Sequence, residues 1–73
     1  MRLHNIHYEI LDNLSLGPLS LPDLTRRSKE TKFEERIGQA LRALEDVGLV
    51  EALSNSHYYG AAQKYRRIYT RYN

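Results

Sequence analysis

The chain has 73 residues, of which 27% are charged and 41% hydrophobic, with no cysteine and a formal net charge of +2. A domain of this size buries only about 60% of the surface that its unfolded chain exposes, so little chain is left to enclose a catalytic cleft. The lack of cysteine excludes disulfides and thiolate zinc sites. No apolar run is long enough for a signal peptide or a membrane span. We therefore predict a single domain, residues 1–73, in the cytoplasm, with no membrane partner and no cofactor.

The charge is unevenly distributed along the chain. Residues 1–51 hold seven Lys and Arg against nine Asp and Glu, whereas residues 52–73 hold four Lys and Arg and no acid. The same C-terminal stretch contains five of the six tyrosines. A basic, tyrosine-rich end on an otherwise acidic domain favours a phosphate-bearing partner. The alternative is a solvated edge strand whose cations discourage aggregation.

Two helices are predicted in the first part of the chain. Apolar residues at four-residue steps predict a helix over residues 5–14, with Asn5 as its N-cap. The Gly-Pro pair that follows ends this helix and starts a short extended stretch. The second helix, over about residues 21–28, has the clearer start, because Ser20 and Asp23 have the spacing of a capping box.

The third helix, about residues 32–47, is predicted from its caps and its apolar spacing. Thr31 is the expected N-cap, with Glu34 completing a second capping box. Gly48 occupies the C′ position, where a positive φ is needed, and therefore ends the helix. The stretch over residues 25–32 has no apolar residue and predicts an exposed turn. The predicted core face of the helix consists of Phe33, Ile37, Leu41 and Leu44.

Two strands are predicted after the third helix, over residues 49–54 and 64–72. The loop between them, residues 55–63, contains a glycine and two small alanines, so the two strands form a hairpin with a long tip. The order of helix, extended stretch, helix, turn, helix and hairpin places the chain in the α+β class.

Three segments carry a resemblance to a known family: GPLSLPDL at 17–24, ALRALEDVGLV at 40–50 and KYRRIYT at 64–70. With them, the chain resembles small winged helix-turn-helix transcription regulators of bacteria, archaea and phages. These include the multiple-antibiotic-resistance and phenolic-acid regulator types. The resemblance implies a winged helix-turn-helix fold, in which three helices precede a C-terminal β-hairpin wing.

The resemblance further implies a DNA-binding transcription regulator. In such proteins the third helix enters the major groove of double-stranded DNA and the wing lies on the backbone or in the minor groove. Arg and Gln on that helix suit guanine and adenine edges, whereas cations in the turn and wing suit phosphates. The residues that this implies as nucleic-acid contacts are Arg26, Arg27, Lys29, Thr31, Lys32, Arg36, Gln39, Arg42, Lys64, Arg66, Arg67 and Arg71.

The chain departs from the family pattern in three places. The turn before the third helix lacks the usual glycine and the apolar residue after it. A homodimer is possible, but the sequence has no helix dedicated to dimerisation, and a monomer on a half-site binds weakly. The third helix also carries four acids that face or flank a polyanion, namely Glu34, Glu35, Glu45 and Asp46.

A second hypothesis is a phage-type winged-helix protein that binds host RNA polymerase or another transcription protein and modulates it by protein contact. Tyr and Arg are favoured at the centres of protein interfaces. The expected contact surface consists of Tyr58, Tyr59, Tyr65, Tyr69 and Tyr72. The alternative for Tyr65 and Tyr69 is that they pack on the helical core. Tyrosines also stack on unpaired bases, so an RNA-binding variant stays open.

The sequence does not predict an enzyme. The three histidines, His4, His7 and His57, do not form a metal signature without cysteine. Neither a G-x-S-x-G nucleophile motif nor a glycine-rich phosphate loop occurs in the sequence. We expect the histidines to be surface or half-buried residues.

Overall fold

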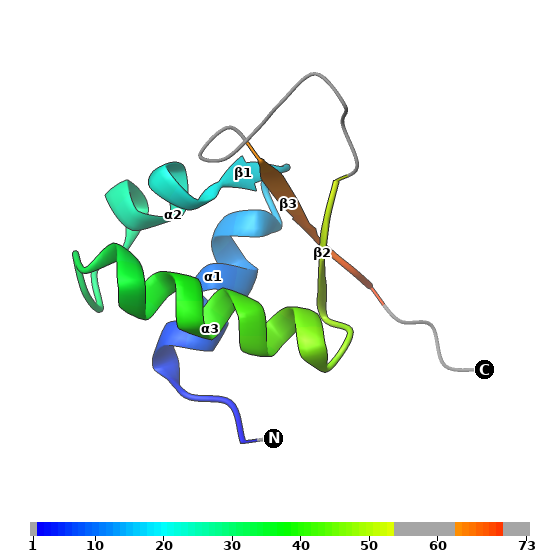
Figure 1. Ribbon diagram of the computed structural model, residues 1–73, viewed down its shortest axis with the longest axis horizontal. Coiled ribbons are helices and arrows are strands. Elements are labelled where there is room, and N and C mark those ends of the chain that lie inside the picture. Colours follow the sequence, from blue (N-terminus) through cyan, green and yellow to red (C-terminus); the bar gives the residue numbers. More distant parts are fainter. Residues whose placement is uncertain (1, 54–62, 70–73) are drawn as a thin grey trace.

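Three helices precede a β-hairpin, in a winged-helix-like order (Figure 1). The structure, a computed structural model, describes residues 2–53 and 63–69. Its elements are α1 (Asn5–Leu14), β1 (Leu19–Ser20), α2 (Leu21–Arg27), α3 (Glu34–Asp46), β2 (Val50–Ala52) and β3 (Lys64–Arg67). The α+β class and the β2–β3 hairpin are confirmed. The hairpin tip and the end of the chain, including the predicted site residues Tyr58, Tyr59, Arg71 and Tyr72 and also His57, lie outside the described residues.

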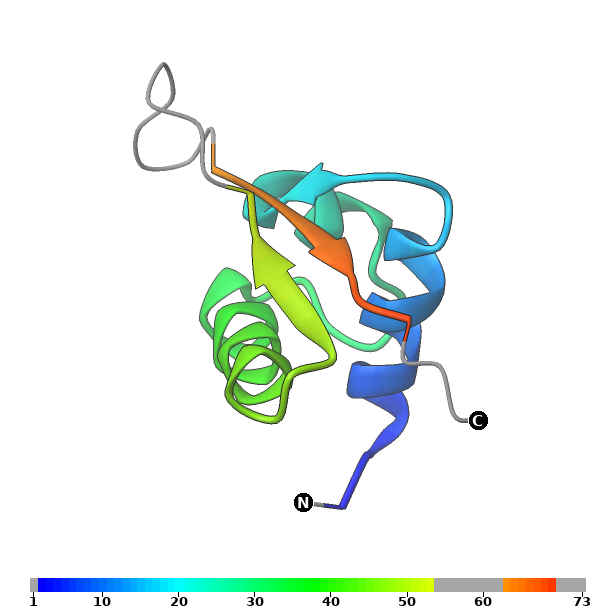
Figure 2. The same cartoon turned by 90° about the vertical axis from the view of Figure 1, so that its right-hand side faces the viewer.

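The short extended stretch after α1 is a strand of the sheet. The order of the three antiparallel strands is β1-β3-β2, so β3 lies in the middle (Figure 2). Leu19 of β1 and Ala52 of β2 both stand opposite Tyr65. Both edge strands are shorter than the mean strand of about five residues. β1 therefore ties the start of α2 to the hairpin that follows α3.

The two predicted N-terminal helices are present, with changes at their ends. α1 has the predicted bounds, but its N-cap is His4 rather than Asn5, because the His4 N–H donates to His7 Nδ1 at 2.9 Å. The capping box of α2 is confirmed. The Asp23 N–H donates to the Ser20 hydroxyl at 3.3 Å, and the Ser20 N–H donates to the Asp23 carboxylate at 3.5 Å. α2 ends at Arg27, one residue before the predicted end.

The predicted start of α3 is wrong by two residues. Phe33, not Thr31, is the N-cap, and it makes no side-chain capping bond. The Thr31 hydroxyl instead accepts the Phe33 N–H at 3.1 Å, which keeps Thr31 in the turn. Phe33 was predicted in the core but is 72% exposed, because the polar stretch before it offers no apolar side chain to cover it.

The predicted end of α3 is confirmed. Gly48 has φ +80°, its N–H donates to the Glu45 carbonyl at 3.0 Å, and the Leu49 N–H donates to the Leu44 carbonyl at 2.9 Å. These two bonds are those of a Schellman motif, which reverses the chain so that β2 can begin. Both strands of the hairpin are shorter than predicted within the described residues.

The core lies where the inner faces of the three helices meet the start of β2. The buried apolar residues are Ile10, Leu11, Leu14, Leu24, Ile37, Ala40, Leu41, Leu44 and Val50. Half-buried Leu3, Ile6, Leu19, Leu21, Leu49 and Tyr65 pack around them. Burial thus fixes the inner face of α3 and leaves its opposite face to solvent. None of the described helices has the length and apolarity that crossing a bilayer requires.

Candidate nucleic-acid interface

The outward face of α3 has a narrow ridge of polar side chains. The helix turns Ile37, Leu41 and Leu44 into the core, so residues half a turn away project furthest into solvent. We call this face the α3 ridge, and it consists of Glu35, Gln39, Arg42 and Asp46, all exposed. An amide and a guanidinium thus stand at its centre with one acid at each end.

Gln39 and Arg42 share a hollow between α2 and α3. This hollow has a volume of about 380 Å³ and is lined by Leu21, Glu34, Glu35, Gly38, Gln39 and Arg42. Gly38 contributes no side chain, so the hollow reaches the α3 backbone next to both polar groups. The two groups are one helical turn apart and therefore lie side by side on the same face of α3. The two glutamates in the same hollow oppose a polyanion.

The cations of the α2–α3 turn do not form one cluster. Arg26 is exposed and forms an ion pair with Asp23, and the Lys32 ammonium donates to the Arg26 carbonyl at 2.9 Å. Arg27 and Lys29 line a separate hollow on the outer side of α1, beside its residue Asp12. The cations at the end of α2 and in the turn after it thus fall into two groups, of which one lies beside α1.

A carboxylate from α1 holds this turn in place. Ser28 is only 1% exposed, and its hydroxyl donates to Glu9 Oε1 at 2.5 Å. The Lys29 N–H donates to Glu9 Oε2 at 2.7 Å, and the Thr31 N–H donates to the Ser28 hydroxyl at 3.2 Å. This contact was not predicted, because the absence of apolar residues over 25–32 indicated a wholly exposed turn. The only available signal was one short serine among long charged side chains.

Side chains on β3 alternate between solvent and the core. Lys64 and Arg66 are exposed, whereas Tyr65 and Arg67 are half-buried. Arg66 pairs with Glu51, its register partner on β2. The Lys64 and Arg66 side chains therefore lie on the outer face of the wing, as a contact with a phosphate backbone requires.

Arg67 faces the helices rather than the outer side of the wing. Its guanidinium donates to the Ser15 hydroxyl at 2.8 Å and to the Leu11 carbonyl at 3.5 Å. It therefore provides hydrogen-bond donors to the C-terminal end of α1. The same group lies 4.8 Å from the centroid of the Tyr69 ring, which is 63% exposed. Arg67 is thus engaged in contacts within the fold, although it was predicted as a phosphate contact.

The two described wing tyrosines differ in their surroundings. Tyr65 packs against the core, which was the predicted alternative to a role in protein contact. Burial raises the pKa of its hydroxyl, and the nearby charge of Glu45 adds to this effect, while Arg42 opposes it. Tyr65 therefore anchors the middle strand of the sheet on the core. Tyr69, in contrast, remains available at the surface.

Comparisons with protein-family models, with curated proteins and with solved structures found no match. Among residues 2–53 and 63–69, no three His, Cys, Asp or Glu side chains come together in a way that could hold a metal ion. The assignment of function therefore depends on the surface of α3 and of the wing.

Proposed function

We propose that the protein is a small DNA-binding transcription regulator that places α3 in the major groove of double-stranded DNA. The observation that carries the proposal is the pair of Gln39 and Arg42 at the centre of the α3 ridge. A helix exposed along one face fits the major groove, and these two side chains match adenine and guanine edges. Lys64 and Arg66, on the outer face of the wing, supply contacts to phosphates.

The charges on this face set the expected strength of binding. The ion pairs Arg26–Asp23 and Arg66–Glu51 are exposed. Exposed pairs of this kind contribute little to stability, so a phosphate can replace either carboxylate. For each phosphate neutralised, the slope of the logarithm of the binding constant against the logarithm of the salt concentration should change by about −0.9. Because Arg67 is held by α1, it should not contribute to this slope. The acids of α3 repel the DNA and lower its affinity further, so measurable binding is expected only at low salt.

Substitutions on the α3 ridge test the proposal. Arg42→Ala should weaken binding to a duplex containing the preferred site by about 5- to 150-fold, the usual range for one bidentate base contact. Glu35→Gln should strengthen binding, because it removes a negative charge beside the DNA. Asp12→Asn, which removes a charge from the outer face of α1, serves as the control for a general change in net charge. Fluorescence anisotropy at two salt concentrations measures all three.

Three results would contradict this function: affinity that does not change with salt, an Arg42→Ala variant that binds like the wild type, or a Glu35→Gln variant no tighter than Asp12→Asn. The experiment should also record whether one or two chains bind each duplex, since a homodimer on two half-sites would bind cooperatively.

One observation favours a second function, contact with RNA polymerase or another transcription protein. α3 exposes or half-exposes four acids against Arg36 and Arg42, a balance that suits a basic protein surface better than DNA. Tyr69 and Phe33 add exposed aromatic area of the kind enriched in interfaces. For this function Glu35→Gln should weaken binding to the partner, whereas the DNA proposal predicts tighter binding to DNA. The same variant therefore distinguishes the two functions.

A further inference from the structure

The start of α1 is capped by a histidine side chain rather than by a carboxylate. The His4 N–H donates to His7 Nδ1 at 2.9 Å, and the His7 N–H donates to the His4 carbonyl at 2.9 Å. His7 thus occupies the N3 position of a capping box, where glutamate or glutamine is the usual acceptor. A ring nitrogen that accepts a hydrogen bond carries no proton, so this contact requires neutral His7 with its proton on Nε2.

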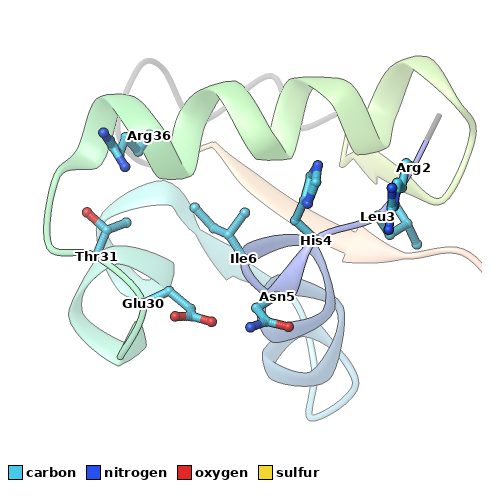
Figure 3. Close-up of a pocket in the computed structure, with 8 residues that line it drawn as sticks. All are labelled: Arg2, Leu3, His4, Asn5, Ile6, Glu30, Thr31 and Arg36. Atoms are coloured by element: carbon cyan, nitrogen blue, oxygen red, sulfur yellow. The ribbon is translucent and has the colours of Figure 1, made fainter.

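The His7 ring is enclosed between α1 and α3. It is only 9% exposed. It shares a hollow of about 400 Å³ with Ile6, Arg36, Gln39 and Ala40. Figure 3 shows His4 and Ile6 pointing from the start of α1 toward α3, with Arg36 on the facing helix. A proton added to this ring would therefore have little access to water.

The groups that face the His7 ring oppose a second proton. On the same helix the His4 ring lies 5.8 Å away between centroids, and Arg36 of α3 lines the same hollow, which has no acid among its described lining residues. The adjoining hollow adds Arg2 and one acid, Glu30. The partial positive charge of the helix N-terminus acts in the same direction as Arg36. Burial first, and then the charge of His4, lower the pKa of His7.

We propose that the start of α1 is a pH-sensitive switch, in which protonation of His7 opens the first helical turn. The imidazolium carries a proton on both ring nitrogens, so Nδ1 no longer accepts the His4 N–H. In the opened turn the ring meets water and its pKa returns to about 6.5, so opening takes up a proton and becomes more favourable as the pH falls. This device goes beyond the proposed DNA binding, because it requires neither DNA nor a partner.

The opening should be confined to the N-terminal end of the helix. The buried residues that hold the remainder of α1 on the core are Ile10, Leu11 and Leu14. Leu3 and Ile6, at the start of the helix, are only half-buried. Protonation of His7 should therefore release Leu3 and Ile6 from the core and uncover the side of α3 that carries Arg36, while the domain stays folded.

Amide hydrogen exchange with water, followed by NMR on the full ¹⁵N-labelled chain, tests the switch. Protection factors are compared between about pH 7.5 and pH 5, the range in which histidine titrates. Protection of the His4 and Tyr8 amides should fall by about three- to tenfold as His7 titrates, the loss expected for one hydrogen bond. The Leu14 amide should keep its protection. The ¹⁵N shifts of the His7 ring should show Nδ1 unprotonated at neutral pH.

Two variants make the test specific. His7→Gln keeps an acceptor at every pH, because glutamine at N3 also completes a capping box, so protection of the His4 amide should not depend on pH. His4→Gln removes the neighbouring ring and leaves His7 Nδ1 in place, so the fall should persist with its midpoint moved closer to about pH 6.5. Since His4 is exposed, this variant should fold even if replacement of the buried His7 prevents folding.

Four results would overturn the proposal. They are constant protection of the His4 amide in the wild type, an equal fall in protection in His7→Gln, a neutral His7 ring protonated on Nδ1, and a parallel loss of protection at Leu14. The last result would mean that the whole domain unfolds rather than its first helical turn. Because the assay contains no DNA, failure of the DNA proposal leaves its outcome unaffected.

Discussion

The contact between Glu9 and the α2–α3 turn makes a quantitative prediction for Ser28→Ala. The substitution removes a hydroxyl that donates to the Glu9 carboxylate at 2.5 Å and accepts the Thr31 N–H at 3.2 Å. A hydrogen bond to a charged group contributes about 1.5–3 kcal/mol and a neutral one about 1 kcal/mol. Because Glu9 is only half-buried, water can replace part of the lost hydrogen bonding in the variant. We therefore expect the free energy of unfolding to fall by about 2 kcal/mol.

This loss is large for so small a domain. At about 0.05–0.15 kcal/mol per residue, the whole chain is stabilised by roughly 4–11 kcal/mol. A loss of 2 kcal/mol should lower Tm by about 8–16 °C at this size. Urea unfolding followed by circular dichroism should show a lower midpoint with an unchanged m value. A change below about 0.5 kcal/mol, which is ordinary for surface substitutions, would refute the reasoning.

A double-mutant cycle attributes the loss to the Glu9–Ser28 contact. Glu9→Ala, Ser28→Ala and the double variant should show a coupling energy of about 1–2 kcal/mol, within the range for directly bonded residues. Asp12→Ala, on the exposed side of the same helix, is the control, and its effect should add to that of Ser28→Ala. Additivity within about 0.5 kcal/mol in the first cycle would mean that Ser28 acts through packing alone.

Further predictions concern two glycines and one histidine. Gly38→Ala should stabilise the folded protein by up to about 1 kcal/mol, because alanine favours the helix more than glycine does. The new Cβ would lie 3.6 Å from Leu21 Cδ2, an ordinary contact. A lower Tm in thermal unfolding would contradict this prediction. Gly48→Ala should destabilise by about 1–2 kcal/mol, since φ is +80° there. Burial, and then the charge of His4, lower the pKa of His7, so its neutral form is favoured in the fold. Below about pH 6.5 the unfolded chain therefore binds more protons, and stability should fall as the pH drops toward the lowered pKa. Urea unfolding at several pH values should show a shallower fall for His7→Gln, and equal slopes would contradict the assignment.

Features held by bonds between near neighbours in sequence were predictable. The capping box of α2 and the Schellman end of α3 join residues three to five positions apart, so the residue types at those positions identify them. Apolar periodicity gave the bounds of α1 and most of the inner face of α3, because a 3.6-residue repeat is a property of the sequence alone. Periodicity failed at Phe33, which has the spacing of a core residue but precedes the first helical turn.

Contacts between distant segments were not predictable in the same way. Nothing near Glu9 indicates that its partners are 19 and 20 residues away. The packing of β3 against α1 and the core sets which wing residues face inward, and no local pattern in the sequence indicates this packing. Consequently Arg66 and Arg67, adjacent and alike in sequence, have opposite surroundings, one across from Glu51 on the wing and the other on the end of α1.

The alternation on β3 also limits how much the basic C-terminal end can contribute to binding. Of the cations described there, Lys64 and Arg66 are exposed, whereas Arg67 bonds to α1 and stacks on Tyr69. The positive charge counted along the sequence therefore overstates the charge available to a phosphate backbone. If α3 binds DNA as we propose, the acids of the α3 ridge should weaken the non-specific attraction, and Gln39 and Arg42 should supply a larger share of the affinity. Arg42→Ala should accordingly reduce DNA binding more than Lys64→Ala does.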